Sequence, residues 1–176
     1  LIPANSEPRT GLAMGDHCQI TAKEWDIPRN EQDELAFASH KNMAKAYEEG
    51  FFDDMMTPFM GLDRDNNLRG DTTLEKLASL KPCFDRENGT MTAANSTPLT
   101  DGASSALLAS EEWAKERGLP ILAYITFCET AAIDFVGKKE GLLIAPAYAV
   151  PRMLDRAGIS LQDFDFYEIH EAFAAQ

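Results

Sequence analysis

The sequence predicts an α/β fold, from two patterns that occupy different parts of the chain. From about residue 100 onward, short apolar runs alternate with segments of helical periodicity, the order expected of strands and helices packed in layers. Before that point, helical segments are separated by polar, glycine-containing loops. With 176 residues, 44% of them apolar, the chain is long enough to bury a core.

Two helices are predicted in the first 50 residues. The first spans Leu12 to Trp25. The second follows Ile27-Pro28, with Asn30 as its cap and acidic residues, Asp33 among them, at the positive end of its dipole. Its apolar residues recur at helical spacing, and Gly50 stands where a helix-ending glycine belongs.

The next fifty residues change composition twice. Residues 51–71 are dense in Asp, Asn and Gly, which predicts an irregular surface excursion. Thr72-Thr-Leu-Glu75 is a capping box that opens a short helix to Leu80. Residues 89–102 are rich in small and hydroxyl side chains and carry little charge, so they stand out from their surroundings.

The remainder of the chain predicts the order strand, helix, strand, helix, strand. The strands are expected at residues 103–109, 121–127 and 164–169. The helices are expected from the cap Ser110 to Gly118, and over 147–157 up to Gly158. Lys138-Lys139, set between glycines, predict a solvated loop tip.

Charge and cysteine content exclude several classes of function. The net charge of −13, from 29 acidic and 16 basic side chains, argues against binding to nucleic acid or anionic membranes. The three cysteines, Cys18, Cys83 and Cys128, have no metal-like spacing, so no metal site is expected. No signal peptide or transmembrane run occurs, which predicts a reducing compartment.

The final residues predict a ligand site. The apolar run that ends at Ile169 is followed by His170-Glu171 and then by the helix-forming residues 172–175. Open α/β sheets place their ligands at the carboxyl ends of strands, just before helix N-termini. Because the chain begins with Leu1 and stops soon after this element, we expect it to be a segment of a longer protein.

At this point the sequence resembles the thiolase family, and in particular its degradative 3-ketoacyl-CoA members. The matching motifs occur in the family's order and span the chain: Gly11-Leu-Ala-Met-Gly, Pro28-Arg-Asn-Glu-Gln-Asp-Glu-Leu-Ala, Thr73-Leu-Glu-Lys-Leu-Ala-Ser-Leu-Lys-Pro-Cys-Phe, Gly89-Thr-Met-Thr-Ala-Ala-Asn-Ser, Asp101-Gly-Ala and His170-Glu-Ala-Phe-Ala-Ala-Gln.

The resemblance implies an acyltransferase that cleaves 3-ketoacyl-CoA with coenzyme A as a substrate and with no permanently bound cofactor. It implies a thiolase-like α/β fold whose parent has five layers. Residues 1–100 resemble the CoA-contacting loop domain, and residues 101–176 resemble the first half of the C-terminal half-domain.

The resemblance also implies that the catalytic nucleophile is missing. The family uses one cysteine from an N-terminal half-domain, and a histidine and second cysteine near the C-terminus. None of the three cysteines of this chain lies in a matching context. Because acyl transfer requires a thiolate, a base and oxyanion donors at one point, we predict that the chain alone does not turn over.

His170 and Glu171 are the predicted catalytic residues. In the resemblance, the residue at position 170, commonly Asn in the family, holds a water that binds the thioester oxygen, and an imidazole N–H can do the same. The alternative is a histidine satisfied in a strand-end hydrogen-bond network. Glu171 could orient His170, or it could be an acid that suits a helix N-terminus.

Six further residues are predicted to contact CoA or its acyl chain, again by resemblance. Arg69 and Phe84 would flank the nucleotide, and Phe173 would contact the pantetheine or acyl chain. The alternatives are a solvated arginine and two core phenylalanines. The same resemblance implies that Thr97, or its neighbour Ser96, bonds a pantetheine amide, and that Met14 lines the acyl pocket.

The structural alternatives for those three are a turn at 96–97 and a core methionine. For the whole chain, the alternatives are a non-catalytic CoA- or acyl-CoA-binding protein and a biosynthetic acetoacetyl-CoA thiolase. The expected partners are acyl-CoA and CoA, a homo-oligomer in the parent, and a hydratase/dehydrogenase subunit. The expected location is the bacterial cytoplasm or the mitochondrial matrix.

Overall fold

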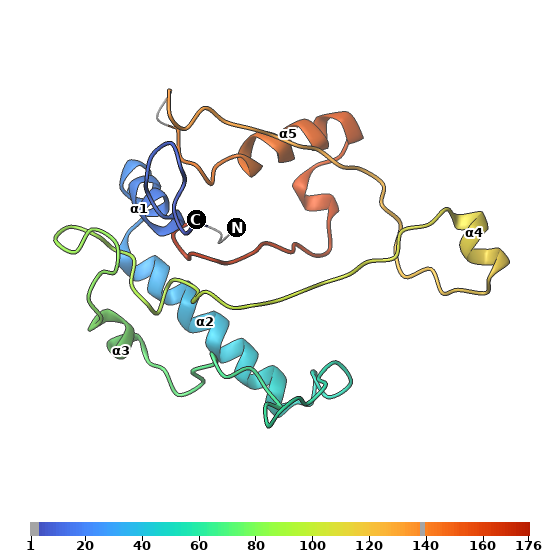
Figure 1. The fold of residues 1–176 in the computed structure, drawn as a ribbon, viewed down its shortest axis with the longest axis horizontal. Helices are drawn as coiled ribbons and strands as arrows, with labels where there is room; N and C mark the ends of the chain where they lie inside the picture. The colour runs from blue at the N-terminus through green and yellow to red at the C-terminus, as the bar shows by residue number, and fades with distance from the viewer. Residues whose placement is uncertain (1–3, 138–139) are drawn as a thin grey trace. The chain divides into compact units, whose positions relative to one another are not determined.

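The computed structural model describes residues 4–137 and 140–176, so the predicted loop tip at Lys138-Lys139 lies outside the described residues. In this part of the chain the regular elements are helices (Figure 1). They are α1 (Met14–Glu24), α2 (Arg29–Glu48), α3 (Leu74–Ala78), α4 (Glu111–Glu116), α5 (Pro146–Ala157) and the short 3₁₀ helix η1 (Leu161–Asp163). None of them is long and apolar enough to cross a membrane.

The five helices predicted between residues 12 and 158 are present, and their helix-ending glycines are confirmed, but the helix-forming residues 172–175 make a bridge and a turn instead of a helix. Gly50, Gly118 and Gly158 follow α2, α4 and α5 with φ values of 73°, 62° and 66°. This left-handed conformation costs glycine little because it has no Cβ. Each glycine therefore marks the end of its helix where the sequence predicted it.

Two of the predicted N-terminal caps are wrong by one or two residues. Helix α2 has Pro28 at its N-cap, so Asn30 lies inside the first turn. Helix α3 is capped by Thr73, whose Oγ1 accepts from the Lys76 amide at 3.2 Å, rather than by Thr72 in a box with Glu75. The prediction for α4 is confirmed, because Ser110 Oγ accepts from the Trp113 amide at 3.2 Å.

The chain forms two compact units. Unit 1 consists of Leu1–Thr97, Asp134–Ile144 and Ile169–Gln176, and unit 2 of Pro98–Ile133 and Ala145–Glu168. The core of unit 1 joins three distant parts of the sequence: Cys18 and Ala22 of α1, Met91, and Ala175 of the C-terminal tail. Ile27, Phe84, Leu143 and Phe173 pack against that core.

Unit 2 contains the main disagreement with the sequence-based expectation. The predicted strands at 103–109, 121–127 and 164–169 are not paired strands within the described residues. Their apolar side chains are exposed, with 77% of Leu107, 92% of Leu122 and 87% of Phe166 accessible. A strand is stabilised by hydrogen bonds to a neighbour, and these segments have no such neighbour in the described part of the chain.

Candidate functional site

The site is built on a loop, residues 89–97, that lies across helices α1 and α2. Gln19 of α1 uses its Oε1 to accept from the backbone amides of Thr90 at 2.8 Å and Met91 at 3.0 Å. Gln32 of α2 donates from Nε2 to Thr90 Oγ1 at 2.9 Å. Both glutamines are buried, so these bonds hold the loop where water does not compete for them.

The loop begins at a point of close backbone approach. A Cβ at Gly89 would lie 2.0 Å from the carbonyl oxygen of Phe84 and 2.8 Å from Gln19 Oε1. The Gly89 amide donates to the carbonyl of Asp85 at 2.7 Å. Only glycine fits this turn, which explains its place at the head of the small-residue run.

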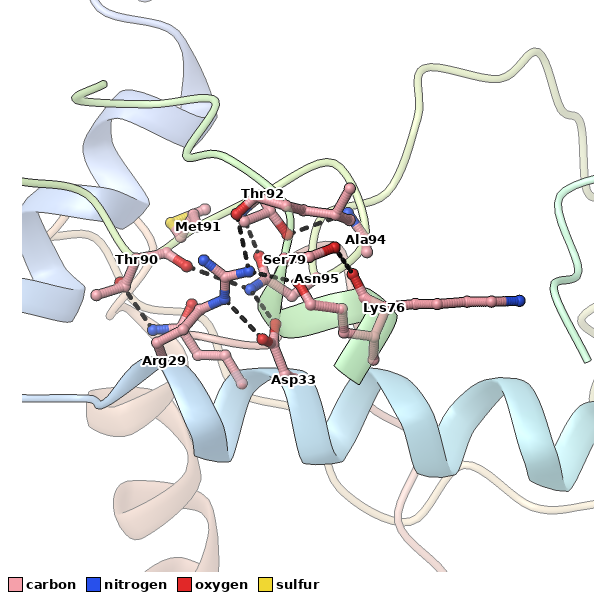
Figure 2. A network of polar contacts seen from close by, with 12 residues as sticks. Arg29, Asp33, Lys76, Ser79, Thr90, Met91, Thr92, Ala94 and Asn95 are labelled. Carbon is pink, nitrogen blue, oxygen red and sulfur yellow. Dashed lines mark hydrogen bonds and ion pairs between the residues drawn. The ribbon is translucent and has the colours of Figure 1, made fainter. Parts of the chain in front are cut away.

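Asn95 ties the other end of the loop to α2, as Figure 2 shows. Its Nδ2 donates to Asp33 Oδ1 at 2.9 Å and to the carbonyl of Thr90 at 3.3 Å. Its Oδ1 accepts from the amide of Thr92 at 2.7 Å. The second oxygen of Asp33 accepts from Arg29 Nε at 2.7 Å, so the buried carboxylate has both a charged and a neutral partner.

The C-terminal tail pairs with this loop. The Thr97 amide donates to the carbonyl of Ala172 at 2.7 Å, and the Ala174 amide donates to the carbonyl of Asn95 at 3.0 Å. Ser96 and Phe173 therefore face each other as an antiparallel bridge. Residues 96–97 and 173, which the sequence predicted to contact the ligand, are thus brought together by two backbone hydrogen bonds.

An aromatic pair lies beside this junction. The rings of Phe84 and Phe173 meet edge to face, with centroids 6.2 Å apart. Both pack against the unit 1 core, as the structural alternative proposed. Phe84 also fills the space over Gly15, where a Cβ would lie 2.0 Å from its ring.

Ser96 carries an unusual hydroxyl. Its Oγ is buried and has no hydrogen-bond partner among the described residues. A buried hydroxyl without a partner is costly, and such a group can be satisfied by a ligand. Thr97, next along the loop, is exposed and has at least one interaction of its own.

His170 and Glu171 lie at the start of the tail and are exposed. Glu171 Oε2 accepts a long hydrogen bond of 3.4 Å from Ser39 Oγ of α2. Within the described residues His170 has no side-chain hydrogen bond, so the predicted strand-end hydrogen-bond network is not seen there. Their roles remain predictions.

Arg69 and Met14 are placed differently from the residues at the tail junction. The guanidinium of Arg69 donates to the backbone carbonyls of Asn66 at 2.7 Å and Leu68 at 3.0 Å. Its amide donates to His40 Nδ1 at 3.3 Å, which attaches this loop to α2. Met14, at the start of α1, is 46% exposed and is not part of the unit 1 core.

A groove of about 720 Å³ adjoins the Arg69 loop. It is lined by Ala44, Tyr47, Glu48, Asp63, Arg64, Asp65, Asn66, Leu68 and Gly70. The lining contains three carboxylates, and its guanidinium, that of Arg64, lies over the Tyr47 ring at 4.6 Å. Burial and the nearby Arg69 charge together lower the pKa of His40, which favours the neutral ring that accepts from the Arg69 amide.

Sequence reasoning missed the contribution of α2. Asp33 bonds the loop, Ser39 contacts Glu171, and His40 holds the Arg69 loop, so one helix positions three segments that carry predicted site residues. Asp33 was expected only to suit a helix dipole. A signal was present, because Arg29 and Asp33 are four residues apart on the same helical face.

The cysteines offer no activated nucleophile. Burial raises the pKa of the Cys18 thiol to about 11, so it is protonated at neutral pH. Cys83 and Cys128 are exposed, and among the described residues no hydrogen bond joins either side chain to a histidine. The described residues also contain no cluster of three side chains that could hold a metal ion. The described residues therefore supply no activated thiolate.

Comparison with known proteins agrees with the motifs. Residues 4–112 match the thiolase N-terminal domain, and residues 119–176 match the thiolase C-terminal domain. The chain is 49% identical, over 180 aligned positions, to the 3-ketoacyl-CoA thiolases of Photobacterium profundum and Serratia proteamaculans. Each alignment covers 99% of this chain and 41% of the relative, so the chain spans about two fifths of their length.

Solved structures give the same result. The chain superposes on the Bacillus anthracis acetyl-CoA acetyltransferase with a TM-score of 0.84 at 38% identity, covering 97% of this chain and 44% of that one. On human mitochondrial 3-ketoacyl-CoA thiolase in complex with CoA, the TM-score is 0.85 at 32% identity, covering 97% and 43%. The predicted thiolase-like α/β fold class is therefore confirmed, although its strand segments are unpaired here. The chain belongs to the thiolase family.

Proposed function

We propose that this chain is part of an acetyl-CoA C-acyltransferase that cleaves 3-ketoacyl-CoA by thiolysis, in fatty-acid β-oxidation. The observation that carries the proposal is the pairing of residues 95–97 with 172–174. It joins the tail that begins with His170 to the Thr97 segment and to Ser96, whose buried hydroxyl has no hydrogen-bond partner in the described part of the chain. The names of the 3-ketoacyl-CoA thiolases that share 49% identity support the reaction class.

In this proposal the chain supplies the CoA-binding wall of the site. The Ser96 or Thr97 hydroxyl bonds a pantetheine amide, and Phe173 contacts the pantetheine or acyl chain beside Phe84. His170 holds the water that stabilises the thioester oxygen as negative charge develops on it. CoA enters as a substrate, and the human thiolase structure solved with CoA supports that assignment.

The nucleophilic thiolate and its base come, in this proposal, from outside these 176 residues. Cys18 is protonated in the core, and neither exposed cysteine is paired with a base in the described residues. The chain alone should therefore bind CoA without thiolysis. The same proposal includes a domain division at residue 100 and a homo-oligomeric parent. It also includes a hydratase/dehydrogenase subunit as partner, and a location in the bacterial cytoplasm or the mitochondrial matrix.

A chimera tests the activity. The matched stretch of the Photobacterium profundum thiolase is replaced by this chain, and thiolysis of a 3-ketoacyl-CoA is measured with added CoA. Activity in the chimera, and none in the chain alone, is the expected result. A correctly folded chimera without thiolysis would overturn the proposed reaction, and turnover by the isolated chain would overturn the missing-nucleophile claim.

Calorimetry with CoA tests the binding residues in the chain itself. Thr97→Ala and Arg69→Ala are each expected to weaken binding by about tenfold, the effect of losing one good polar contact. Lys45→Ala, a change at an exposed cation of α2 that forms an ion pair with Glu49, serves as the control. Unchanged affinity in both variants would remove these two residues from the site.

A second candidate is a biosynthetic acetoacetyl-CoA thiolase, favoured by the similarity to the Bacillus anthracis acetyl-CoA acetyltransferase. The same chimera separates the two, because a biosynthetic enzyme would prefer acetoacetyl-CoA over longer 3-ketoacyl-CoA substrates. CoA binding without any turnover in the chimera would instead favour the non-catalytic CoA-binding alternative.

A further inference from the structure

Asn95 occupies a branch point in unit 1, because its side chain and its backbone bond different parts of the chain. The side chain bonds Asp33 on α2 and the backbone of the Thr90–Thr92 turn. The backbone carbonyl accepts from Ala174 in the C-terminal tail at 3.0 Å. Movement of this one residue would therefore displace the tail relative to α2.

The bonding pattern requires an asparagine with one amide orientation. Nδ2 faces two acceptors, the Asp33 carboxylate and the Thr90 carbonyl, while Oδ1 faces the Thr92 N–H. Reversing the amide would place its oxygen against both acceptors. An aspartate at this position would place a second carboxylate against Asp33.

The Asp33 carboxylate is equally constrained. Asp33 and Asn95 are each only 3% exposed, so water does not compensate for a lost partner. Arg29 balances the Asp33 charge through Nε at 2.7 Å, and its Nη2 donates to the Leu77 carbonyl at 2.6 Å. The pair is thus anchored to α2 and, through Arg29, to α3 (Figure 2).

We propose that Asp33 and Asn95 are positioning residues for the acyl-transfer site. By fixing residues 95–97 against α2, they set the register of the pairing with residues 172–174, and so place the His170 that precedes this pairing. The placement of the tail follows from contacts on this chain. The consequence for the reaction rests on the proposed function.

Amide hydrogen exchange on the 176-residue chain tests the positioning directly. In Asn95→Asp, two carboxylates replace the donor–acceptor pair, and the Thr97 and Ala174 amides are expected to exchange about tenfold faster or more. Amides in the middle of α2 should be unchanged, because the helix hydrogen bonds do not depend on Asn95. A uniform increase across unit 1 would show a general stabilising role instead and would overturn the proposal, as would no increase.

Thr21→Val is the matched control. It removes the hydrogen bond from Thr21 Oγ1 to the His17 carbonyl at a similarly buried place on α1, and it leaves the hydrogen bonds of the 89–97 loop in place. The Thr97 and Ala174 amides should then exchange within about twofold of the parent rate. The double variant Asp33→Asn with Asn95→Asp restores a donor opposite an acceptor and should recover part of the protection. Absence of recovery, or an equal effect of Thr21→Val, would contradict a specific role for the pair.

Kinetics of the chimera provide the second readout. Asn95→Asp is expected to lower kcat by about tenfold or more while changing KM less, since the misplaced group acts on the developing oxyanion. An unchanged kcat in an active chimera would overturn the catalytic consequence and leave the proposed function intact. If the parent chimera is inactive, the proposed function fails, and the exchange experiment still decides whether the pair positions the tail.

Discussion

Unit 2 is at least as rich in apolar residues as unit 1, yet it buries far less of them. In unit 1, Cys18 and Met91 are fully buried, and polar residues such as Gln32 and Asn95 are buried beside them with hydrogen bonds. In the described part of unit 2, Ala114 is the only buried residue. Apolar content alone therefore does not make a core; the segments that carry it need partners.

The two units differ in where those partners lie. Unit 1 is organised by α2. The backbone hydrogen bonds of this helix are local, and its side chains Asp33 and Ser39 hydrogen-bond to the 89–97 loop and the C-terminal tail. The apolar segments of unit 2 would need neighbouring strands, which are non-local by nature. The Photobacterium profundum thiolase has over half of its length outside the region that matches this chain.

The largest expected contrast is in amide hydrogen exchange of the isolated chain. The Cys83 amide, which donates to the Met91 carbonyl at 2.9 Å, should exchange about a thousandfold more slowly than amides of the unpaired 121–127 segment. The comparison can be made by NMR in one sample. Similar protection in both places would mean that the 121–127 segment is paired in solution, and the contrast between the units would then disappear.

Truncation of apolar side chains should separate the units next. Met91→Ala removes a fully buried side chain and is expected to lower the free energy of unfolding by about 2–5 kcal/mol. Leu122→Ala, at a residue 92% exposed, should change it by less than about 0.5 kcal/mol. Urea denaturation monitored by circular dichroism gives both values. A large effect of Leu122→Ala would show that unit 2 has a hidden core.

A smaller contrast is expected from adding one methyl group. Gly89→Ala places a Cβ 2.0 Å from the Phe84 carbonyl oxygen, and relieving that overlap should cost about 1–3 kcal/mol. Gly102→Ala is the control, because nothing lies within 4 Å of its Cβ and its φ is not in the left-handed region. Thermal unfolding of both variants is the measurement; equal midpoints would show that the 85–89 turn relaxes freely.

The smallest contrast concerns the thiols. The buried Cys18 thiol, with a pKa raised from 9.0 to about 11, should resist an alkylating reagent that modifies Cys128 at about pH 8. Below about pH 9 the thiol is protonated in both the folded and unfolded states. Between about pH 9 and 11 the unfolded state loses the proton first, so the free energy of unfolding should fall over that interval.

Cys18→Ala tests this assignment, because it should abolish the part of the pH dependence that lies between about 9 and 11. Cys128→Ala, at an exposed thiol, should leave that part in place. If Cys128→Ala removed it instead, the buried thiol would not be its origin.

The helices could be predicted because their signals are local. Ser110 caps α4 and Gly158 ends α5 as the sequence predicted, since each acts within one turn of its own helix. The strands could not be judged in the same way. The apolar run 164–169 has the composition of a strand, but pairing depends on a neighbour that no local pattern specifies.

The candidate site was predictable as a set of residues but not as an arrangement. The motifs marked Ser96, Thr97 and Phe173, and the structure brings all three to one junction. The hydrogen bond between Asn95 and Asp33 could not be foreseen. These residues are 62 positions apart, and a hydrogen bond between distant segments leaves no periodic pattern in the sequence. Arg69 is a different case. The resemblance marked it as a residue near the CoA nucleotide, whereas its guanidinium donates to backbone carbonyls of its own turn.

The two hydrogen bonds between residues 95–97 and 172–174 also close a large loop in the polypeptide. The entropy of closing a flexible loop grows only with the logarithm of its length, by about 0.6 kcal/mol for each doubling. Lengthening, shortening or rearranging the segments of unit 2 within that loop should therefore cost the junction little. The tail junction can persist while unit 2 adopts whatever pairing its surroundings provide.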